Sequence, residues 1–546
     1  MTTKERPNSS EAWILGSGTA SLASALYLVR LANYPPQKVH VLDSHGSLGD
    51  AMHHRGDPSS GYDQFAGCLP VPVGEPLKQL LALVPSVRNE NRSVFDEIQN
   101  SQAKSKKGNG IEHTQFLVQR DGVLRSIPTK SLNLSIRQRL ALARLILKRE
   151  KSLHRTQIND YLPRSFFQST FWAIWSAQFG FQPWHSASEF RRTIRQYLQE
   201  FHGLTILSCL DITGRFQFES TFLPIYHFLR SLQVDFRFDS KVKEIGTAIR
   251  NGGGNGDGKR KGGAPTVTWL DLVEKGLDVR QPIGPDDIVL FALGSTVSGS
   301  ATGTDDRAPF RKSMQASEAL DENWSLWLEL AGKHPCFGDP YNFCTRQCES
   351  MLESFTVTTE DVEVYEQLCA LSGNSAQAGA FIALQESPWR MNLCLPTQPV
   401  FAEQPRNVRV FWGFANFPMS EGKYVAKAMV RCSGAEIMHE LVKHLKLDEQ
   451  HLVRRTVTVP RVMPRMSAIL LPRAVGDRPG IVPEGVSNVG LVGQFCEIPQ
   501  HSCVDMSYSV RTAQRAVSQL TGLGIEQQSA LGGLNLSTVV KVLCWR

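Results

Sequence analysis

The chain has 546 residues, a formal net charge of +7 at pH 7, and 41% hydrophobic and 20% charged residues. This composition excludes a disordered or collagen-like chain, and the length allows several domains around large buried cores. The mean hydropathy is −0.21, and neither a run of ~20 apolar residues nor a secretory signal is recognisable. We therefore expect a cytoplasmic protein.

The mild positive charge suits an anionic small molecule, an anionic membrane surface or nucleic acid. No zinc-finger or RNA-recognition motif accompanies it, so we expect no nucleic-acid partner. The 11 cysteines are scattered, and no second close pair completes a zinc site with Cys344 and Cys348. We therefore expect no metal site and no disulfide framework.

The first predicted elements form a strand–helix–strand unit. Trp13–Leu15 is a short apolar strand, Ala20–Val29 has helical periodicity, and Val39–Asp43 is a second apolar strand. Such a unit begins many α/β domains with a parallel sheet.

The turn between the first strand and the helix has the residue types that bind a dinucleotide. Gly16 and Gly18 let backbone N–H groups approach a pyrophosphate at the helix N-terminus, and Asp43 can accept ribose hydroxyls. Ser21 replaces the third glycine of this pattern. The alternative interpretation is an ordinary glycine-rich turn.

The rest of the chain alternates between helical and strand-like patterns. Residues 99–112 are polar and predict a loop, and residues 250–264 are of low complexity and predict a disordered hairpin tip. Helical patterns dominate residues 137–200. The further predicted strands are Val234–Val242, Thr266–Asp278, Asp287–Gly294, Val408–Trp412 and Gly490–Gly493. A further predicted helix is Ser509–Leu520.

Longer motifs of a known family run through nearly the whole chain. They are Trp13–Asp43, His45–Met52, Gly61–Ser86, Phe181–Arg192, Ser354–Thr359, Val410–Phe414, Phe417–Pro418, Gly476–Gly480, Gly493–Pro499 and Tyr508–Arg511. Together they resemble the oleate hydratase family, also called the myosin-cross-reactive-antigen flavoproteins. The resemblance implies an FAD cofactor, a long-chain unsaturated fatty acid substrate and addition of water to an isolated double bond. It also implies a homodimer and peripheral contact with membranes.

The resemblance further implies an α/β fold: a Rossmann-like FAD-binding domain with an inserted mixed α+β substrate lobe and a helical C-terminal part. The expected division is 11–60 first part of the FAD domain, 61–235 largely helical substrate lobe, 236–300 FAD-domain strands, 301–475 substrate-binding lobe, 476–525 return to the FAD domain and 526–546 tail. The residues expected to contact FAD are Gly16, Gly18, Ser21, Asp43, Ser44, Gly493, Gln494 and Phe495.

Both presumed catalytic positions depart from the family pattern. The family's water-activating glutamate falls on Leu69, and its tyrosine falls on Thr193. Leucine cannot accept a proton, and the threonine hydroxyl is a far weaker acid than a phenol. The residues expected to line the substrate pocket are Phe65, Gly67, Cys68, Leu69 and Thr193.

Other groups are candidates for the missing chemistry. Tyr197 lies about one helical turn after Thr193, Glu75 follows Leu69 in the same segment, and His185 follows a tryptophan in a matched motif. For each, a packing, surface or structural role is the alternative. The basic run Arg191–Arg195 predicts either an anion site or a solvated helix face.

Four hypotheses remain open at this level. Isomerisation of a double bond in a fatty acid or polyene suits the loss of the glutamate, because a reduced flavin can serve as the proton or hydride shuttle. The others are hydration by relocated residues, an oxidase or desaturase, and a lipid-binding flavoprotein without catalysis.

Overall fold

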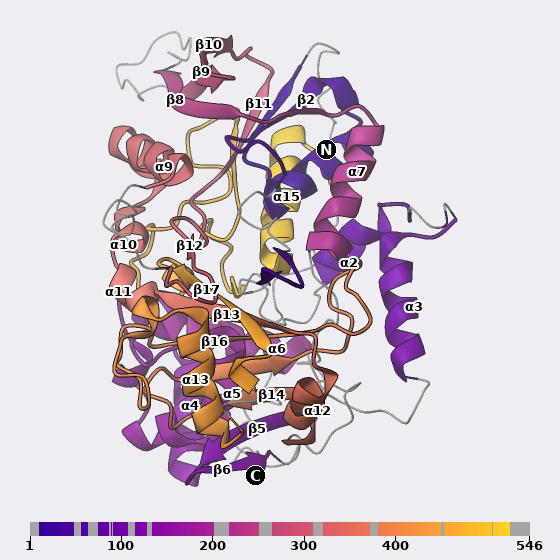
Figure 1. Cartoon of the computed structure of the whole chain (residues 1–546). Coiled ribbons are helices and arrows are strands. Elements are labelled where there is room, and N and C mark those ends of the chain that lie inside the picture. The colour runs from indigo at the N-terminus through magenta and orange to yellow at the C-terminus, as the bar shows by residue number, and fades with distance from the viewer. Residues whose placement is uncertain are drawn as a thin grey trace.

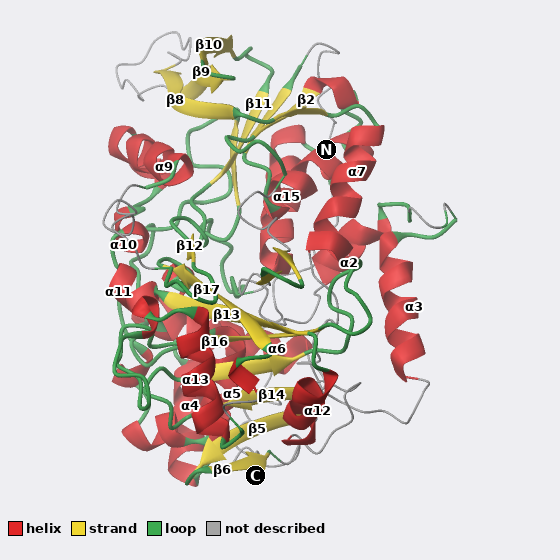
Figure 2. Ribbon diagram, in the orientation of Figure 1, coloured by secondary structure: helices red, strands yellow, loops and turns green. Residues whose placement is uncertain are grey.

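The computed structural model describes residues 10–48, 56–63, 75–86, 89, 91–106, 115–127, 134–200, 218–249, 265–309, 320–371, 380–448, 452–504 and 506–524. A parallel sheet occupies the upper part of the molecule in Figure 1, and a larger mixed sheet occupies the lower part. Helices cover both sheets (Figure 2). The predicted α/β class is confirmed.

The parallel sheet has five strands in the order β18-β11-β1-β2-β7. They are β1 (Ala12–Leu15), β2 (Val39–Leu42), β7 (Asp235–Arg237), β11 (Ile288–Ala292) and β18 (Val489–Val492). All four residues of β1, of β2 and of β18 are buried, as expected for strands covered on both faces. The chain fills the sheet on one side of β1 with β2 and β7, and later on the other side with β11 and β18. The switch point of the topology therefore lies between β1 and β11.

Two helices pack directly on this sheet, and two more pack against those helices. α1 (Thr19–Arg30) packs against α15 (Met506–Thr521) and α7 (Leu223–Ser231), and α15 also contacts α2 (Glu75–Ala82). α1 is buried along almost its whole length, because its alanines and serines allow close approach. Two of these helices, α2 and α7, belong to the range 61–235 that was expected to form the substrate lobe. The packing therefore does not follow the predicted boundaries there.

The larger sheet has eight strands in the order β12-β17-β13-β16-β15-β14-β5-β6, and only β14 and β5 pair in parallel. The strands are β5 (Gln115–Arg120), β6 (Val123–Ser126), β12 (Ala301–Thr302), β13 (Leu352–Thr359), β14 (Ala380–Ala383), β15 (Met391–Leu395), β16 (Arg409–Ala415) and β17 (Thr456–Met463).

Successive residues of these strands face two separate cores. In β16, Phe411 packs into the core shared with α12 (Val362–Leu371) and α13 (Gly434–Leu445), whereas Trp412 packs into the core that continues to the parallel sheet. α5 (Thr170–Phe179) lies on the Trp412 side, because it contacts β5 and β14 and contributes Phe171 and Trp175 to that core. The other helices of this part are α4 (Ile136–Leu147), α6 (Ala187–Glu200), α10 (Tyr341–Cys344) and α11 (Gln347–Ser350), whereas α9 (Glu322–Lys333) lies in the upper part of the molecule in Figure 1 and packs against the strand Ser240–Ile249.

Two smaller sheets complete the described fold. β8 (Ser240–Ile249), β9 (Pro265–Glu274) and β10 (Leu277–Pro282) form an antiparallel meander, and β3 (Gly56–Asp57) pairs with β4 (Gly61–Tyr62). β4 lies against β13 and β17 of the large sheet. The predicted disordered tip at 250–264 lies outside the described residues.

One predicted loop is wrong in its first half. Residues 99–106 belong to α3 (Val94–Lys106), which begins with reciprocal bonds between Ser93 and Asp96: each backbone N–H donates to the other side chain. The Ser93 N-cap and the acids in the first turn were the missed sequence signals. No described helix has the length and apolar character needed to span a bilayer. The described residues also contain no cluster of His, Cys, Asp and Glu able to hold a metal.

Candidate active site

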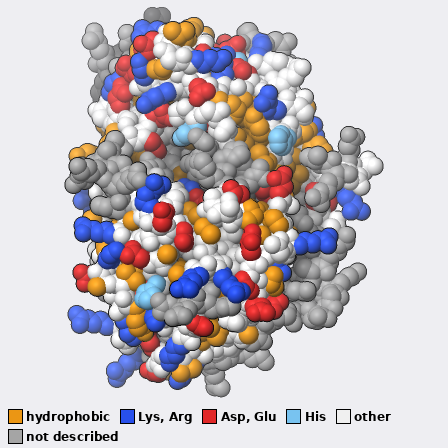
Figure 3. All heavy atoms as spheres, viewed as in Figure 1, with side chains coloured by type: hydrophobic (Ala, Val, Ile, Leu, Met, Phe, Trp, Pro, Cys, Tyr) orange, Lys and Arg blue, Asp and Glu red, His pale blue; other side chains and the backbone are white. Residues whose placement is uncertain are grey.

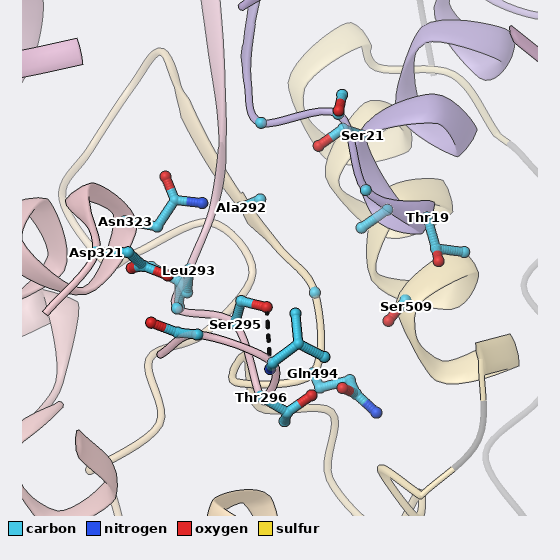
Figure 4. A pocket seen from close by; sticks show the side chains of 18 of the residues that line it. Thr19, Ser21, Ala292, Leu293, Ser295, Thr296, Asp321, Asn323, Gln494 and Ser509 are labelled. Atoms are coloured by element: carbon cyan, nitrogen blue, oxygen red, sulfur yellow. Dashed lines mark hydrogen bonds between the residues drawn. The ribbon is translucent and has the colours of Figure 1, made fainter. Parts of the chain in front are cut away.

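A cavity of about 820 Å³ lies at the carboxyl ends of the parallel strands, at the switch point. Its walls come from distant parts of the chain: the glycine turn after β1, the loop after β11, the start of α9 and the loop after β18 (Figure 4). Such a volume is in the range of cofactor and substrate pockets. Gly16, Gly18, Ser21, Asp43, Ser44, Gly493 and Gln494 all line it.

The glycine turn has the geometry of an anion-binding turn. Gly16 has a φ of +102°, which favours glycine, and its N–H donates to the Leu42 carbonyl at 2.8 Å, which ties the turn to the end of β2. Gly18 is the N-cap of α1 and no side chain caps this helix. Its first N–H groups therefore remain available to an anion in the cavity.

Asp43 stands at the end of β2 as an ionised acceptor. One oxygen, Oδ1, accepts the backbone N–H of His45 at 2.9 Å and contacts its ring Nδ1 at 2.8 Å, and Oδ2 accepts the Ser17 hydroxyl. Burial acts to raise the pKa of Asp43, but these hydrogen bonds outweigh it and lower the pKa. A carboxylate oxygen can accept two bonds, so Oδ2 can take one more donor from a ligand.

Two buried hydroxyls face the cavity without a protein partner among the described residues. They are Oγ of Ser21, in the first turn of α1, and Oγ of Ser298, in the loop after β11. A buried hydroxyl without a partner is costly, which predicts that a ligand accepts from both. Ser21, which stands where the dinucleotide pattern has its third glycine, thus gives the cavity wall a hydroxyl donor.

Sequence reasoning missed the opposite wall of the cavity. It consists of Gly294–Ser300, which follows β11, and of Asp321, Glu322 and Asn323 at the start of α9 (Figure 4). Burial raises the pKa of the Glu322 carboxyl, although a hydrogen bond from Ser44 opposes the shift. The signal for this wall was the buried strand that ends in Gly294, because parallel strands end at one edge of their sheet.

The cavity continues into an apolar region. Phe179, Phe222, Leu352 and Met466 line it, and Leu352 and Met466 pack with Val297 of the loop after β11. Phe222 closes a π-helical turn, Phe218–Phe222, that leads directly into α7. Arg461 of β17 also lines this region and forms a buried ion pair with Asp63.

The loop after β18 is held firmly beside the cavity. The hydroxyl of Tyr508 on α15 accepts the N–H of Ile498 at 2.9 Å and donates to the Cys496 carbonyl at 2.7 Å. The Gln494 amide donates to the Cys503 carbonyl at 3.1 Å. Phe495 does not line the cavity: it packs against Trp324, Trp327 and Phe343, so its expected contact with the cofactor is corrected to a core position.

Thr193, expected to line the substrate pocket, and Tyr197, a candidate for catalysis, do not line the cavity either. Thr193 donates its hydroxyl to the Glu189 carbonyl at 2.8 Å, and its oxygen lies 2.8 Å from Oγ of Ser502. Tyr197 is buried edge-on against Trp175 and Phe179. Phe179 lines the cavity, so Tyr197 supports the wall from behind and the structure gives it a packing role.

His185 and Glu75 likewise have structural or surface positions. Nδ1 of His185 accepts the Gln182 N–H at 3.0 Å, and Nε2 lies 3.4 Å from the Glu349 carbonyl. Burial lowers the pKa of His185 to about 3, so the ring is neutral at ordinary pH. Glu75 is half-exposed and pairs with Lys78 at 2.8 Å. Neither residue lines the cavity.

The basic run on α6 is buried, which excludes the solvated helix face. Arg192 pairs with Glu189, Glu150 and Glu497, and Glu189 is bonded in turn by Arg473 and Arg478. These six residues form an ionic cluster that joins α6 to the loops carrying Gly476–Gly480 and Gly493–Pro499. Phe65, Gly67, Cys68 and Leu69 lie outside the described residues.

The fold and cavity define the class: an α/β protein with a cavity at the switch point of a parallel sheet, which is where such folds bind their ligands. The MCRA family model matches residues 9–518, and the chain belongs to this family. This confirms the resemblance that the motifs indicated.

Individual relatives agree with the family. The chain is 28% identical to an oleate hydratase of Streptococcus pyogenes serotype M49 (strain NZ131), over 93% of this chain and 84% of the relative. It is 25% identical to a linoleate hydratase of Lactiplantibacillus plantarum, over 95% and 94% of the two chains. A solved structure, an oxidoreductase from Methanosarcina mazei, aligns with 12% identity and a TM-score of 0.47 over 92% of this chain and 100% of the other. A likeness this distant bears on neither substrate nor reaction.

Proposed function

We propose that the chain is a flavin-dependent enzyme that acts on a carbon–carbon double bond of a long-chain unsaturated fatty acid or polyene. The observation that carries this proposal is the cavity. Its hydroxyl-rich part, formed by the glycine turn after β1, Asp43, the loop after β11 and the start of α9, is hereafter called the nucleotide region. It continues into an apolar region lined by Phe179, Phe222, Leu352 and Met466. Family membership suggests a flavoprotein, and both relatives are named for fatty acids.

FAD suits the nucleotide region. The N–H groups at the start of α1 and the Ser21 hydroxyl would hold the pyrophosphate, and Oδ2 of Asp43 would accept a ribose hydroxyl. The backbone at Gly493 and Gln494 would meet the edge of the flavin ring. When bound, the flavin supplies a ring able to exchange a proton or hydride at one face.

Within this function, we propose double-bond isomerisation as the reaction. The carboxylic acids among the described lining residues, Asp43, Asp321 and Glu322, all belong to the nucleotide region. The apolar region thus offers a substrate chain no described carboxylate to activate a water, which hydration requires. Its aromatic and aliphatic walls exclude water and orient an extended chain.

Hydration is the second candidate, because both relatives are named hydratases. Its acid and base would have to come from residues other than Glu75, which does not line the cavity and forms an exposed ion pair with Lys78. An oxidase or a non-catalytic lipid binder would use the same cavity. The oxidase would consume oxygen, and the lipid binder would form no product.

One experiment separates these reactions. Purified flavin-loaded protein, oxidised or reduced with dithionite, is incubated with oleate or linoleate in ¹⁸O-labelled water, and the products are analysed by mass spectrometry. We expect a product of unchanged mass and shifted retention. One labelled oxygen would establish hydration instead, substrate-dependent oxygen uptake would establish oxidation, and binding without any product would contradict an enzyme acting on these lipids.

A further inference from the structure

Two buried arginines on α6 stand outside the ionic cluster described above. Arg191 is 5% exposed and Arg195 is 8% exposed. They are four residues apart, so they lie on one side of the helix, about one turn from each other. Neither of them lines the cavity. Because a buried charge is costly unless an opposite charge pairs with it, both arginines require counter-charges nearby.

The protein compensates Arg191 only in part. Its Nε donates to the Ile146 carbonyl at 3.1 Å, at the end of α4. Its Nη1 lies 3.6 Å from Oε2 of Glu150 but is buried without a hydrogen-bond partner among the described residues. Burial, and after it the charge of Arg195, lower the pKa of Arg191 to about 10. Positive charge therefore exceeds negative charge around this guanidinium.

Arg195 is compensated even less. It forms no hydrogen bond or ion pair with any residue that the structure describes, and Glu150 is the acid whose charge acts on it. Burial lowers the pKa of Arg195 as well. The residue keeps 8% of its surface exposed, so a small ion can reach it from solvent.

The ionic cluster has no negative charge left for these two arginines. Its three glutamates, which include Glu150, are balanced by its three arginines. The exposed residues near Glu150 in the chain are also cations: Lys148, Arg149 and Lys151. On the face of the molecule shown in Figure 3, by contrast, acidic and basic side chains are interspersed. Arg191 and Arg195 thus form an uncompensated pair of positive charges beside the end of α4.

We propose that Arg191 and Arg195 bind a phosphate group of a small soluble ligand. A phosphate monoester carries a charge of about −1.5 to −2 near pH 7, which matches two uncompensated arginines. The planar guanidinium donates to phosphate oxygens in pairs, and two such groups one helical turn apart can share one phosphate. A pair of arginines compensated by solvent alone would show no selectivity among anions. The site lies outside the cavity, so the proposal stands or falls independently of the proposed enzyme function.

Isothermal titration of the purified full chain, loaded with FAD and freed of excess FAD, tests the proposal. Inorganic phosphate and ribose 5-phosphate are the probes, and the buffer contains chloride at constant ionic strength. We expect saturable binding of a phosphate probe at a single site. Tighter binding of ribose 5-phosphate would assign the site to a phosphate monoester, and tighter binding of inorganic phosphate would assign it to the free ion.

Substitutions locate the binding. Arg195→Gln should weaken phosphate binding about tenfold or more, because it removes a charged hydrogen-bond donor. Arg195→Lys should weaken it to a smaller extent, because lysine keeps the charge and loses the planar pair of donors. The matched control is Arg125→Gln on β6, which removes an exposed arginine elsewhere and should bind phosphate like the wild type.

Thermal melts separate a binding role of Arg195 from a structural one. Without phosphate, Arg195→Gln should melt at the wild-type temperature or above it, because it removes a like charge beside Arg191. Phosphate should raise the melting temperature of the wild type and leave that of Arg195→Gln unchanged. Equal phosphate affinity of the two proteins would overturn the proposal, as would a wild-type melting temperature that responds to phosphate no more than to chloride at equal ionic strength.

Discussion

Oε1 of Glu189 lies 3.1 Å from Nη1 of Arg478, and neither side chain has any exposed surface. The two residues come from α6 and from the loop after β17, which are far apart in the sequence. Arg192 and Arg473 bind the same carboxylate, and Arg192 and Arg473 also bind Glu497 beside the cavity. The ionic cluster therefore fixes the loop that forms one wall of the candidate site.

Glu189→Gln should destabilise the protein strongly. Removing one partner of a buried ionic group leaves uncompensated charge and typically costs about 3–5 kcal/mol. Urea unfolding measures this loss. Glu75→Gln is the control, because the exposed pair with Lys78 contributes about 1 kcal/mol or less. Equal stabilities of the two variants would contradict the assigned role of the cluster.

The same carboxylate should make stability depend on acid pH. Burial acts to raise the pKa of Glu189, but Arg478, Arg192 and Arg473 outweigh it and hold the pKa at about 2, against an ordinary value of 4.5. Because the folded-state pKa is depressed, the stabilisation is present above the unfolded value and is lost as the pH falls through the folded one. Acid titrations of the unfolding free energy should show this loss in the wild type and less of it in Glu189→Gln.

Glu353 on β13 should show the opposite behaviour. It is fully buried, neither carboxyl oxygen has a hydrogen-bond partner among the described residues, and burial raises its pKa well above the usual range. The folded protein holds the protonated form, so its stability should fall as the pH rises above the ordinary value of 4.5. Glu353→Leu should stabilise the protein by about 1–3 kcal/mol at neutral pH.

Chemical unfolding at about pH 5 and about pH 8 tests this expectation. Glu353→Gln serves as the control, since it removes the titration and keeps an uncharged polar group in the core. A loss of stability in Glu353→Leu at both pH values would show that the carboxyl has a favourable partner and would refute the prediction.

Gly16→Ala should separate cofactor binding from backbone strain. Gly16 and Gly276 both have left-handed φ values, +102° and +84°, so alanine should cost either position about 1–2 kcal/mol. Only Gly16 borders the cavity, where a Cβ would obstruct the approach of a pyrophosphate. Thermal melts should show similar losses, whereas titration of apoprotein with FAD should show weaker binding for Gly16→Ala alone. Equal FAD affinity of the two variants would show that the glycine turn does not contact the cofactor.

Tyr197→Phe should leave turnover of the fatty acid close to that of the wild type, because the ring packs behind Phe179 and does not line the cavity. Phe179→Ala should lower turnover, because it removes a lining surface. Steady-state rates with linoleate or oleate compare the two variants. A large loss of turnover in Tyr197→Phe, with an unaltered melting temperature, would show that the Tyr197 hydroxyl takes part in the reaction.

The sequence predicted the part of the candidate site whose residues are close together in the chain. The strand, the glycine turn, the helix and Asp43 are consecutive in the chain, so their pattern fixes their geometry. Ser298 and Glu322 reach the same cavity only because β11 lies beside β1, which depends on the order of strands in the sheet. The sequence left open whether Arg192 lies on a solvated helix face, because its partner Glu497 lies far away in the sequence.

The proposed function requires the cavity at the switch point to hold FAD. The most direct measurement is identification of the flavin released by denaturing the purified full chain, together with its binding to the apoprotein. We expect about one equivalent of FAD per chain, and we expect Gly16→Ala to weaken FAD binding and Gly276→Ala to leave it unchanged. A folded chain that neither contains nor binds FAD, or one whose FAD binding is unaffected by Gly16→Ala, would contradict it.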